Sequence, residues 1–170
     1  MPVATPMNAV DLLRLRREHV DRLAATSGAA GEIAAATVAL TWIPRPKGAD
    51  LKRLIATLAD EGIEIQGSAF DFIAVPEDVV VDLKQTESIR AALPRLTFIE
   101  VKTANSARVL PGFKNFFFAL TEKEILASDA LGSQHVVVLF NKATEEMLYT
   151  SVQAILSQSR STNWQVSVQL

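Results

Sequence analysis

The spacing of apolar residues changes near residue 62, from a helical period to a strand-like one. Before this point, residues 10–24 place apolar side chains among charges at roughly helical spacing, and residues 27–40 are rich in alanine. Both ranges therefore predict helices. A breaker cluster follows at 43–48. Residues 50–60 predict a third helix with one apolar face, ended by Gly62.

Beyond residue 62, apolar residues alternate with polar ones or form short continuous runs, as they do in strands. The expected strands lie at 63–65, 69–75, 79–81, 97–103, 135–140, 147–151 and 164–170. We expect a short helix or loop at 87–93, and a loop at 104–115 whose turn is Pro111-Gly112. The sequence Thr121-Glu-Lys-Glu124 has the spacing of a capping box and predicts a helix that runs to Gly132.

This order of elements predicts one α/β domain, residues 1–170, in which helices flank a mixed central sheet. Residues 1–61 would supply amino-terminal helices, and residues 62–170 would form the sheet core that carries the candidate site. The composition agrees with this interpretation. Of the 170 residues, 49% are hydrophobic and 21% are charged, which is ordinary for a globular domain with a core of its own.

Composition also narrows the possible chemistry. The absence of cysteine excludes disulfides and thiolate metal sites, and two histidines are too few for a histidine-rich zinc site. The chain starts without the pattern of a signal peptide and contains no apolar run of membrane-spanning length, so we expect a cytoplasmic protein without a membrane partner. With a net charge of −2, any affinity for nucleic acid must come from a local basic patch.

The expected strand at 97–103 carries the most informative pair of charges. The side-chain period of two puts Glu100 and Lys102 on one face, and Ile99 and Val101 on the other. A carboxylate and an ammonium held side by side can form a site for a hard metal ion and an activated water. The alternative interpretation is an exposed ion pair, which contributes little to stability.

A second carboxylate lies inside an apolar segment. Asp71 stands between Phe70 and Phe72, where an ionised group is costly unless something pairs with it. From 101 to 121 the chain has no acidic residue but includes Lys102, Arg108 and Lys114, and this is its one charge-biased window. The phenylalanines at 113 and 116–118 are expected in the core rather than as a base-stacking platform, with Phe113 open to either role. We expect His135 to be a satisfied structural histidine.

The order of elements, with Asp71 on one strand and Glu100-Val-Lys102 on the next, resembles the core of the PD-(D/E)xK nuclease superfamily. More narrowly, the strand ending Phe98-Ile-Glu-Val-Lys-Thr103, the segment at 116–124 and the apolar strand after it resemble the branch related to the carboxy-terminal domain of the plant NO VEIN protein. The resemblance covers roughly residues 64–141. In addition, Gly28-Ala-Ala-Gly-Glu32 resembles the start of the leading helix in that branch.

The resemblance implies a restriction-endonuclease-like core with extra amino-terminal helices. Asp71 and Glu100 would be ligands of Mg²⁺ or Mn²⁺, with the carbonyl oxygen of Val101 as a further ligand. Lys102 would hold or deprotonate the attacking water, and Glu32 would be an accessory acid. The interval between Asp71 and Glu100 is long for this superfamily, so Asp82 competes with Asp71 for the role of the aspartate.

The function implied is that of a metal-dependent endonuclease that hydrolyses phosphodiester bonds of DNA. Arg108 and Lys114 in the 104–115 loop would contact backbone phosphates. We expect such a domain to act as a homodimer or with a partner protein. The main alternative is a catalytically inactive nuclease-like domain that serves as a protein- or nucleic-acid-interaction module. A small-molecule-binding domain is disfavoured, because no glycine-rich phosphate loop follows a strand.

Overall fold

The computed structural model describes residues 40–104 and 108–159. The predicted helix at 10–24, all but the last residue of the predicted helix at 27–40, the predicted strand at 164–170 and the candidate acid Glu32 lie outside these residues. None of the helices in the described ranges is both long and apolar enough to cross a membrane.

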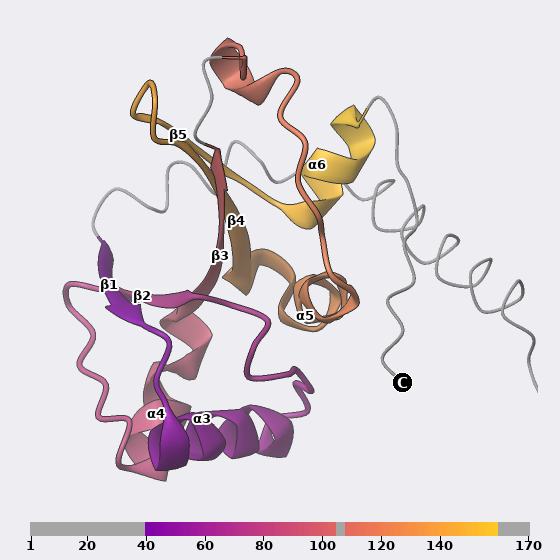
Figure 1. The fold of residues 1–170 in the computed structure, drawn as a ribbon. Coiled ribbons are helices and arrows are strands. Elements are labelled where there is room, and N and C mark those ends of the chain that lie inside the picture. The colour runs from indigo at the N-terminus through magenta and orange to yellow at the C-terminus, as the bar shows by residue number, and fades with distance from the viewer. Residues whose placement is uncertain (1–39, 105–107, 160–170) are drawn as a thin grey trace, which may run out of the picture.

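A five-stranded sheet forms the centre of the described structure, with its strands in chain order (Figure 1). The strands are β1 (Leu40–Pro44), β2 (Phe72–Pro76), β3 (Thr97–Ala104), β4 (His135–Asn141) and β5 (Glu146–Thr150). Neighbouring strands are antiparallel except β3 and β4, which are parallel. The predicted α/β class and mixed sheet are therefore confirmed.

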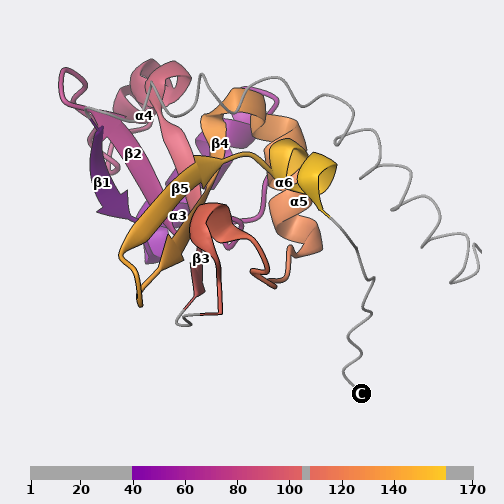
Figure 2. The ribbon, with the colours of Figure 1, turned by 90° about the horizontal axis from the view of Figure 1, so that it is seen from above.

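Within the described ranges, four α-helices accompany the sheet: α3 (Gly48–Asp60), α4 (Thr86–Ala92), α5 (Glu122–Leu131) and α6 (Val152–Gln158). Short 3₁₀ turns lie at Leu93–Arg95, Pro111–Phe113 and Gly132–Gln134. Figure 1 shows α3 and α4 together below the β1 and β2 end, and Figure 2 shows α5 beside α6. Helix α5 lies in the crossover from β3 to β4, as a parallel pair of strands requires.

All four helices pack on the same face of the sheet. One apolar cluster joins α3, α4 and part of α5 to β2 and to Phe98 of β3, and a second joins α5 and α6 to Val137 and Leu139 of β4. Phe98 pairs with His135 and Glu100 with Val137, so both clusters occupy the same face by the period-two alternation. A third cluster, which includes Ile99 and Val138, lies on the opposite face.

This division of faces positions the candidate site. As the alternation predicted, Glu100 and Lys102 share the helix-covered face with Phe98, while Ile99 and Val101 point to the other face. The two charged residues therefore lie under α5. Helix α5 begins at the predicted capping box, in which the N–H of Thr121 donates to Oε2 of Glu124 at 3.0 Å.

The structure corrects the predicted strands at 63–65 and 79–81, which form no strand. Ile63, Ile65, Val79 and Val81 still pack on the first cluster, whereas Val80 is 90% exposed. In these two segments, alternate side chains are buried because an irregular backbone runs over the core, and not because the backbone pairs in a sheet. Apolar alternation alone does not distinguish these two cases.

Two short elements were not predicted. Strand β1 (Leu40–Pro44) pairs with β2 although its last two residues, Ile43 and Pro44, belong to the breaker cluster. Helix α6 (Val152–Gln158) begins where the hydroxyl of Ser151 accepts a hydrogen bond from the N–H of Ala154. Both elements are too short to show a period, so tertiary pairing rather than local pattern determines them.

Candidate active site

Lys102 stands at the centre of a buried group of charges that we call the acid–lysine cluster. Its ammonium Nζ lies 2.9 Å from Oε1 of Glu100 and 2.8 Å from Oε2 of Glu124. The side chains of Lys102, Glu100 and Glu124 are only 13%, 10% and 5% exposed. The alternative of an exposed Glu-x-Lys pair is therefore wrong for this chain. Charges this far from water interact strongly, and each depends on the others for its solvation.

Two elements bring the cluster together. Glu100 and Lys102 are two residues apart on β3, so their side chains leave the same face of the strand. Glu124 is the third residue of α5, and its Oε2 accepts both from Lys102 and from the N–H of Thr121. Glu124 was predicted as a helix cap but not as a member of the site. The signal that could have revealed it is the capping box at the start of the helix that follows the Glu-x-Lys strand.

Asp71 lies beside the cluster, immediately before β2. Its N–H donates to the carbonyl of Ile99 at 2.7 Å, and its Oδ2 accepts from the N–H of Val101 at 3.0 Å. The carboxylate of Asp71 thereby accepts the hydrogen bond that a backbone carbonyl of a neighbouring strand would otherwise accept from β3. The N–H and C=O of one strand residue point to the same side, so the carbonyl of Val101 faces the same edge as Asp71.

Asp82, the competing aspartate, belongs to a different part of the molecule. Its carboxylate accepts from the N–H of Lys84 at 2.9 Å and from the side-chain amide of Gln85 at 2.8 Å. These bonds form a turn that precedes α4, and the hydrogen bond from Lys84 is the main cause of the lowered pKa of Asp82. The structure therefore places Asp71, and not Asp82, next to Glu100.

Burial and neighbouring charges shift the pKa values of the two cluster carboxyls in opposite directions. Burial raises the pKa of Glu100 to about 7, and the negative charges of Glu124 and Asp71 add to the rise while Lys102 opposes it. Burial also acts to raise the pKa of Glu124, but hydrogen bonds from Lys102 and Thr121 outweigh it and leave that pKa below its ordinary value. Glu124 thus stays ionised, and Glu100 is the group that accepts a proton most readily.

Lys102 remains an ammonium despite its burial. Burial acts to lower the pKa of Lys102, yet the hydrogen bonds to Glu124 and Glu100 more than compensate, so its pKa is raised. These two bonds use two of the three donors that an ammonium carries. The third can donate to a water or a phosphate oxygen, which makes Lys102 suited to holding a reactant and unsuited to removing a proton from it.

His135 is fully buried at the start of β4 and is only partly satisfied. Its Nε2 lies 3.3 Å from the carbonyl of Ala69, whereas Nδ1 has no hydrogen-bond partner. The prediction of a satisfied structural histidine is therefore confirmed for Nε2 and wrong for Nδ1. Burial lowers the pKa of His135, so the folded protein holds the ring in its neutral form.

We predict that His135 makes the protein less stable in acid. Because the pKa of His135 is lower in the folded state than its ordinary 6.5, the unfolded chain binds a proton first as the pH falls below 6.5. The free energy of unfolding should drop by up to about 2 kcal/mol between pH 7 and pH 5 relative to His135→Gln. Urea denaturation of both proteins at several pH values measures this difference. Parallel pH profiles for the two proteins would contradict it.

The loop that precedes α5 keeps its basic residues at the surface. Arg108 and Lys114 are exposed, and a β-bridge between Leu110 and Lys114 closes the turn around Gly112, whose φ is 70°. Phe113 is buried in the second apolar cluster, so of the two roles left open for it the structure shows packing in the core.

Most of the oxygen atoms at the site that could ligate a metal ion belong to carboxylates. Within the described ranges, no group of three or more acidic or histidine side chains is arranged to hold a metal ion. Two carboxylates still suit Mg²⁺, which is usually held by one or two carboxylates, retained waters and substrate phosphates. Asp71, Glu100 and the Val101 carbonyl carry oxygen atoms of the type that this ion prefers.

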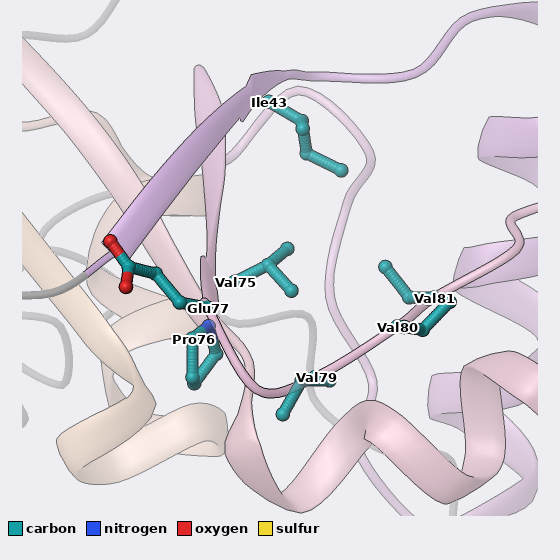
Figure 3. Close-up of a pocket in the computed structure, with 7 residues that line it drawn as sticks. All are labelled: Ile43, Val75, Pro76, Glu77, Val79, Val80 and Val81. Atoms are coloured by element: carbon teal, nitrogen blue, oxygen red, sulfur yellow. The ribbon is translucent and has the colours of Figure 1, made fainter.

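A separate pocket of about 300 Å³ lies at the far end of β2 (Figure 3). Its lining is apolar except for one carboxylate, and consists of Ile43, Val75, Pro76, Glu77, Val79, Val80 and Val81. None of these residues belongs to the acid–lysine cluster. The pocket lining includes no acid, base or nucleophile beyond Glu77.

Comparisons of the chain with models of protein families, with curated proteins and with solved structures found no match.

Proposed function

We propose that this chain is a Mg²⁺-dependent phosphodiesterase that cleaves DNA, built on a core like that of the PD-(D/E)xK nucleases. The observation that carries the proposal is the position of Asp71 beside the strand that holds the Glu100–Lys102 pair. The β2 and β3 segments bring the aspartate to the backbone of Val101, next to Glu100, and Glu100 is bonded to Lys102. This is the set of groups that the resemblance required to converge.

The crowding of negative charge supports a cation at this place. Two carboxylates, those of Glu100 and Glu124, flank the ammonium of Lys102, and the carboxylate of Asp71 lies beside them at the backbone of Val101. Burial and these acidic neighbours raise the pKa of Glu100 to about 7. Asp71 and Glu100 would hold the ion together with the Val101 carbonyl. When bound, Mg²⁺ would neutralise charge developing on the scissile phosphate and lower the pKa of the attacking water.

The remaining groups have separate proposed roles. Lys102, kept as an ammonium, would donate a hydrogen bond to the attacking water or to a phosphate oxygen. Of the two roles considered for this lysine, its raised pKa favours holding the water over deprotonating it. Glu124 would fix the ammonium in position, because its own carboxylate is anchored to the start of α5 by Thr121.

The basic loop would bind the substrate backbone. Arg108 and Lys114 lie on the exposed part of a window that lacks acidic residues, and each could neutralise a phosphate without reading a base. The net charge of −2 gives the whole chain little attraction for DNA, so we propose that a second copy or a partner protein supplies further contacts.

The test is cleavage of supercoiled plasmid and of single-stranded DNA with Mg²⁺ or Mn²⁺. We expect nicking that needs the cation, stops with EDTA and returns when excess Mg²⁺ is added. Isothermal titration of the protein with Mn²⁺ gives an independent readout, in which Glu100→Gln should weaken the uptake of the ion. Cleavage that is insensitive to EDTA, or no cation uptake by the native protein, would contradict the proposal.

A second candidate function is that of an inactive domain that binds a partner. The observation that favours it is the closed state of the cluster, in which one oxygen of each glutamate is already occupied by Lys102. Such a module would bind its partner equally well before and after Glu100→Gln and would take up no Mn²⁺. The same titration therefore separates the two candidates.

A further inference from the structure

Phe117 is displayed on the surface of the chain. It is 86% exposed, whereas every other phenylalanine of the protein is buried or half-buried. The prediction that all the aromatics at 113 and 116–118 belong to the core is therefore wrong for this residue. A large aromatic ring with almost no packing contributes little to the stability of the fold, so its side chain is free to contact a ligand.

The extended backbone around Phe117 explains its outward position. Phe116, Phe118 and Leu120 pack against the second apolar cluster, and the rings of Phe116 and Phe118 lie 5.0 Å apart. In an extended segment alternate side chains point to opposite sides, so anchoring residues 116, 118 and 120 directs residues 117 and 119 to solvent. Phe117 is thus held outward by its neighbours on both sides.

The turn before this segment is also fixed. Gly112, Phe113 and Asn115 have φ values of 70°, 58° and 65°, a conformation that is unusual for a phenylalanine. The buried ring of Phe113 and the bridge between Leu110 and Lys114 hold the backbone there. Such conformations persist where the surrounding structure enforces them, and they cluster at ligand-binding segments.

Charge indicates the kind of ligand that the ring fits. Phe117 lies inside the window from 101 to 121 that contains no acidic residue, three positions after the exposed Lys114. Seven residues after Phe117 comes Glu124, whose carboxylate holds Lys102. Proteins bind single-stranded nucleic acids by combining exposed aromatic rings, on which bases stack, with cationic side chains that pair with phosphates, and this segment exposes one of each.

We propose that Phe117 is a stacking platform for an unpaired base of a single-stranded nucleic acid. The inference rests on the proposed function and deepens it, because it makes single-stranded or locally unpaired strands the preferred substrate of the acid–lysine cluster. Lys114 contributes backbone attraction, and the ring contributes the preference for bases that are not already stacked in a duplex.

The test measures the affinity of labelled single-stranded DNA, single-stranded RNA and blunt duplex DNA by fluorescence anisotropy, with EDTA present to prevent cleavage. The native protein should bind single strands more tightly than duplex. Phe117→Ala should weaken single-strand binding by about tenfold and leave duplex binding unchanged. Phe117→Trp should retain the affinity, and its fluorescence should be quenched on binding. Val80→Ala, which removes an apolar side chain that is 90% exposed in another loop, is the matched control and should bind like the native protein.

Several results would overturn the inference. The first is an equal affinity of Phe117→Ala and of the native protein for single strands, and the second is no single-strand binding by the native protein. The third is a loss of self-association in Phe117→Ala while oligonucleotide binding is unchanged. The last result would assign the ring to a contact between copies. Unchanged binding by Phe117→Ala combined with Mg²⁺-dependent cleavage would remove the inference and keep the nuclease. Weakened single-strand binding by Phe117→Ala without cleavage would keep the inference and remove the nuclease.

Discussion

Asp71→Asn is expected to lower the rate of Mg²⁺-dependent DNA cleavage by roughly 10³-fold, while Asp82→Asn leaves it unchanged. A bound cation would stabilise charge in the transition state, and loss of one charged oxygen ligand removes several kcal/mol of that stabilisation. Each loss of about 1.4 kcal/mol lowers the reaction rate tenfold. Initial rates of plasmid nicking at saturating Mg²⁺ measure the effect. The two substitutions remove the same charge from the two aspartates that the sequence alone left in competition.

The asparagine is expected to preserve the backbone contact of this position, so the comparison reports the loss of the charge. Its side-chain oxygen can still accept from the N–H of Val101, the bond that Oδ2 of Asp71 makes in the native protein. Glu100→Gln should give a similar loss. The double variant should be no slower than either single variant, because in the proposed site the two residues would hold the same ion. Nicking by Asp71→Asn at the native rate would show that the activity comes from a contaminant or from another site.

Lys102→Met is expected to destabilise the protein by about 3–5 kcal/mol at pH 8. The substitution retains the apolar stem but leaves Glu100 and Glu124 buried without a positive partner, which is the costly way to break a buried ion pair. The free energy of unfolding in urea measures the loss. Glu124→Gln added to Lys102→Met should recover part of it, because one of the two unpaired charges is removed.

The destabilisation should also depend on pH in a defined direction. Without Lys102, the folded-state pKa of Glu100 rises further above that of the unfolded chain, and the pKa of Glu124 rises because the ammonium no longer holds it down. A carboxyl with a raised folded pKa contributes stability at low pH and loses it as the pH rises through that value. Lys102→Met should therefore be closest to the native protein near pH 5 and furthest from it at pH 8. A constant difference across this range, or one below about 1 kcal/mol, would contradict the buried pairing.

Loss of cleavage in a lysine variant is thus weaker evidence for catalysis than loss in Asp71→Asn. A protein in which Lys102 is removed can be inactive because its core is disturbed. Lys102→Arg, which retains the charge, offers the better comparison. Its planar guanidinium cannot reproduce the compact ammonium between Glu100 and Glu124, so activity should fall while most of the stability is kept.

The elements with strong local signals were predictable from the sequence. The amphipathic face of α3, the capping box of α5 and the continuous apolar run of β4 each appear as predicted. Each of these signals repeats over several residues or fixes a helix end. In such segments the local propensity and the pattern of burial favour the same secondary structure, so the prediction is reliable. Strand β1 and helix α6 lack such repetition, and the segments around Ile63 and Val80 show apolar spacing without the partner strand that a sheet requires.

By itself, the sequence determined which side chains share a face on a single element. The period of two placed Glu100 with Lys102, and the capping spacing tied Glu124 to Thr121, because both relations depend on the geometry of a few consecutive residues. The tertiary structure alone decided that Glu124 reaches Lys102, that Asp71 rather than Asp82 meets Val101, and that the whole cluster is buried. Those relations join residues 22 and 30 positions apart, and such distant groups meet only when strand pairing and helix packing have fixed the elements that carry them.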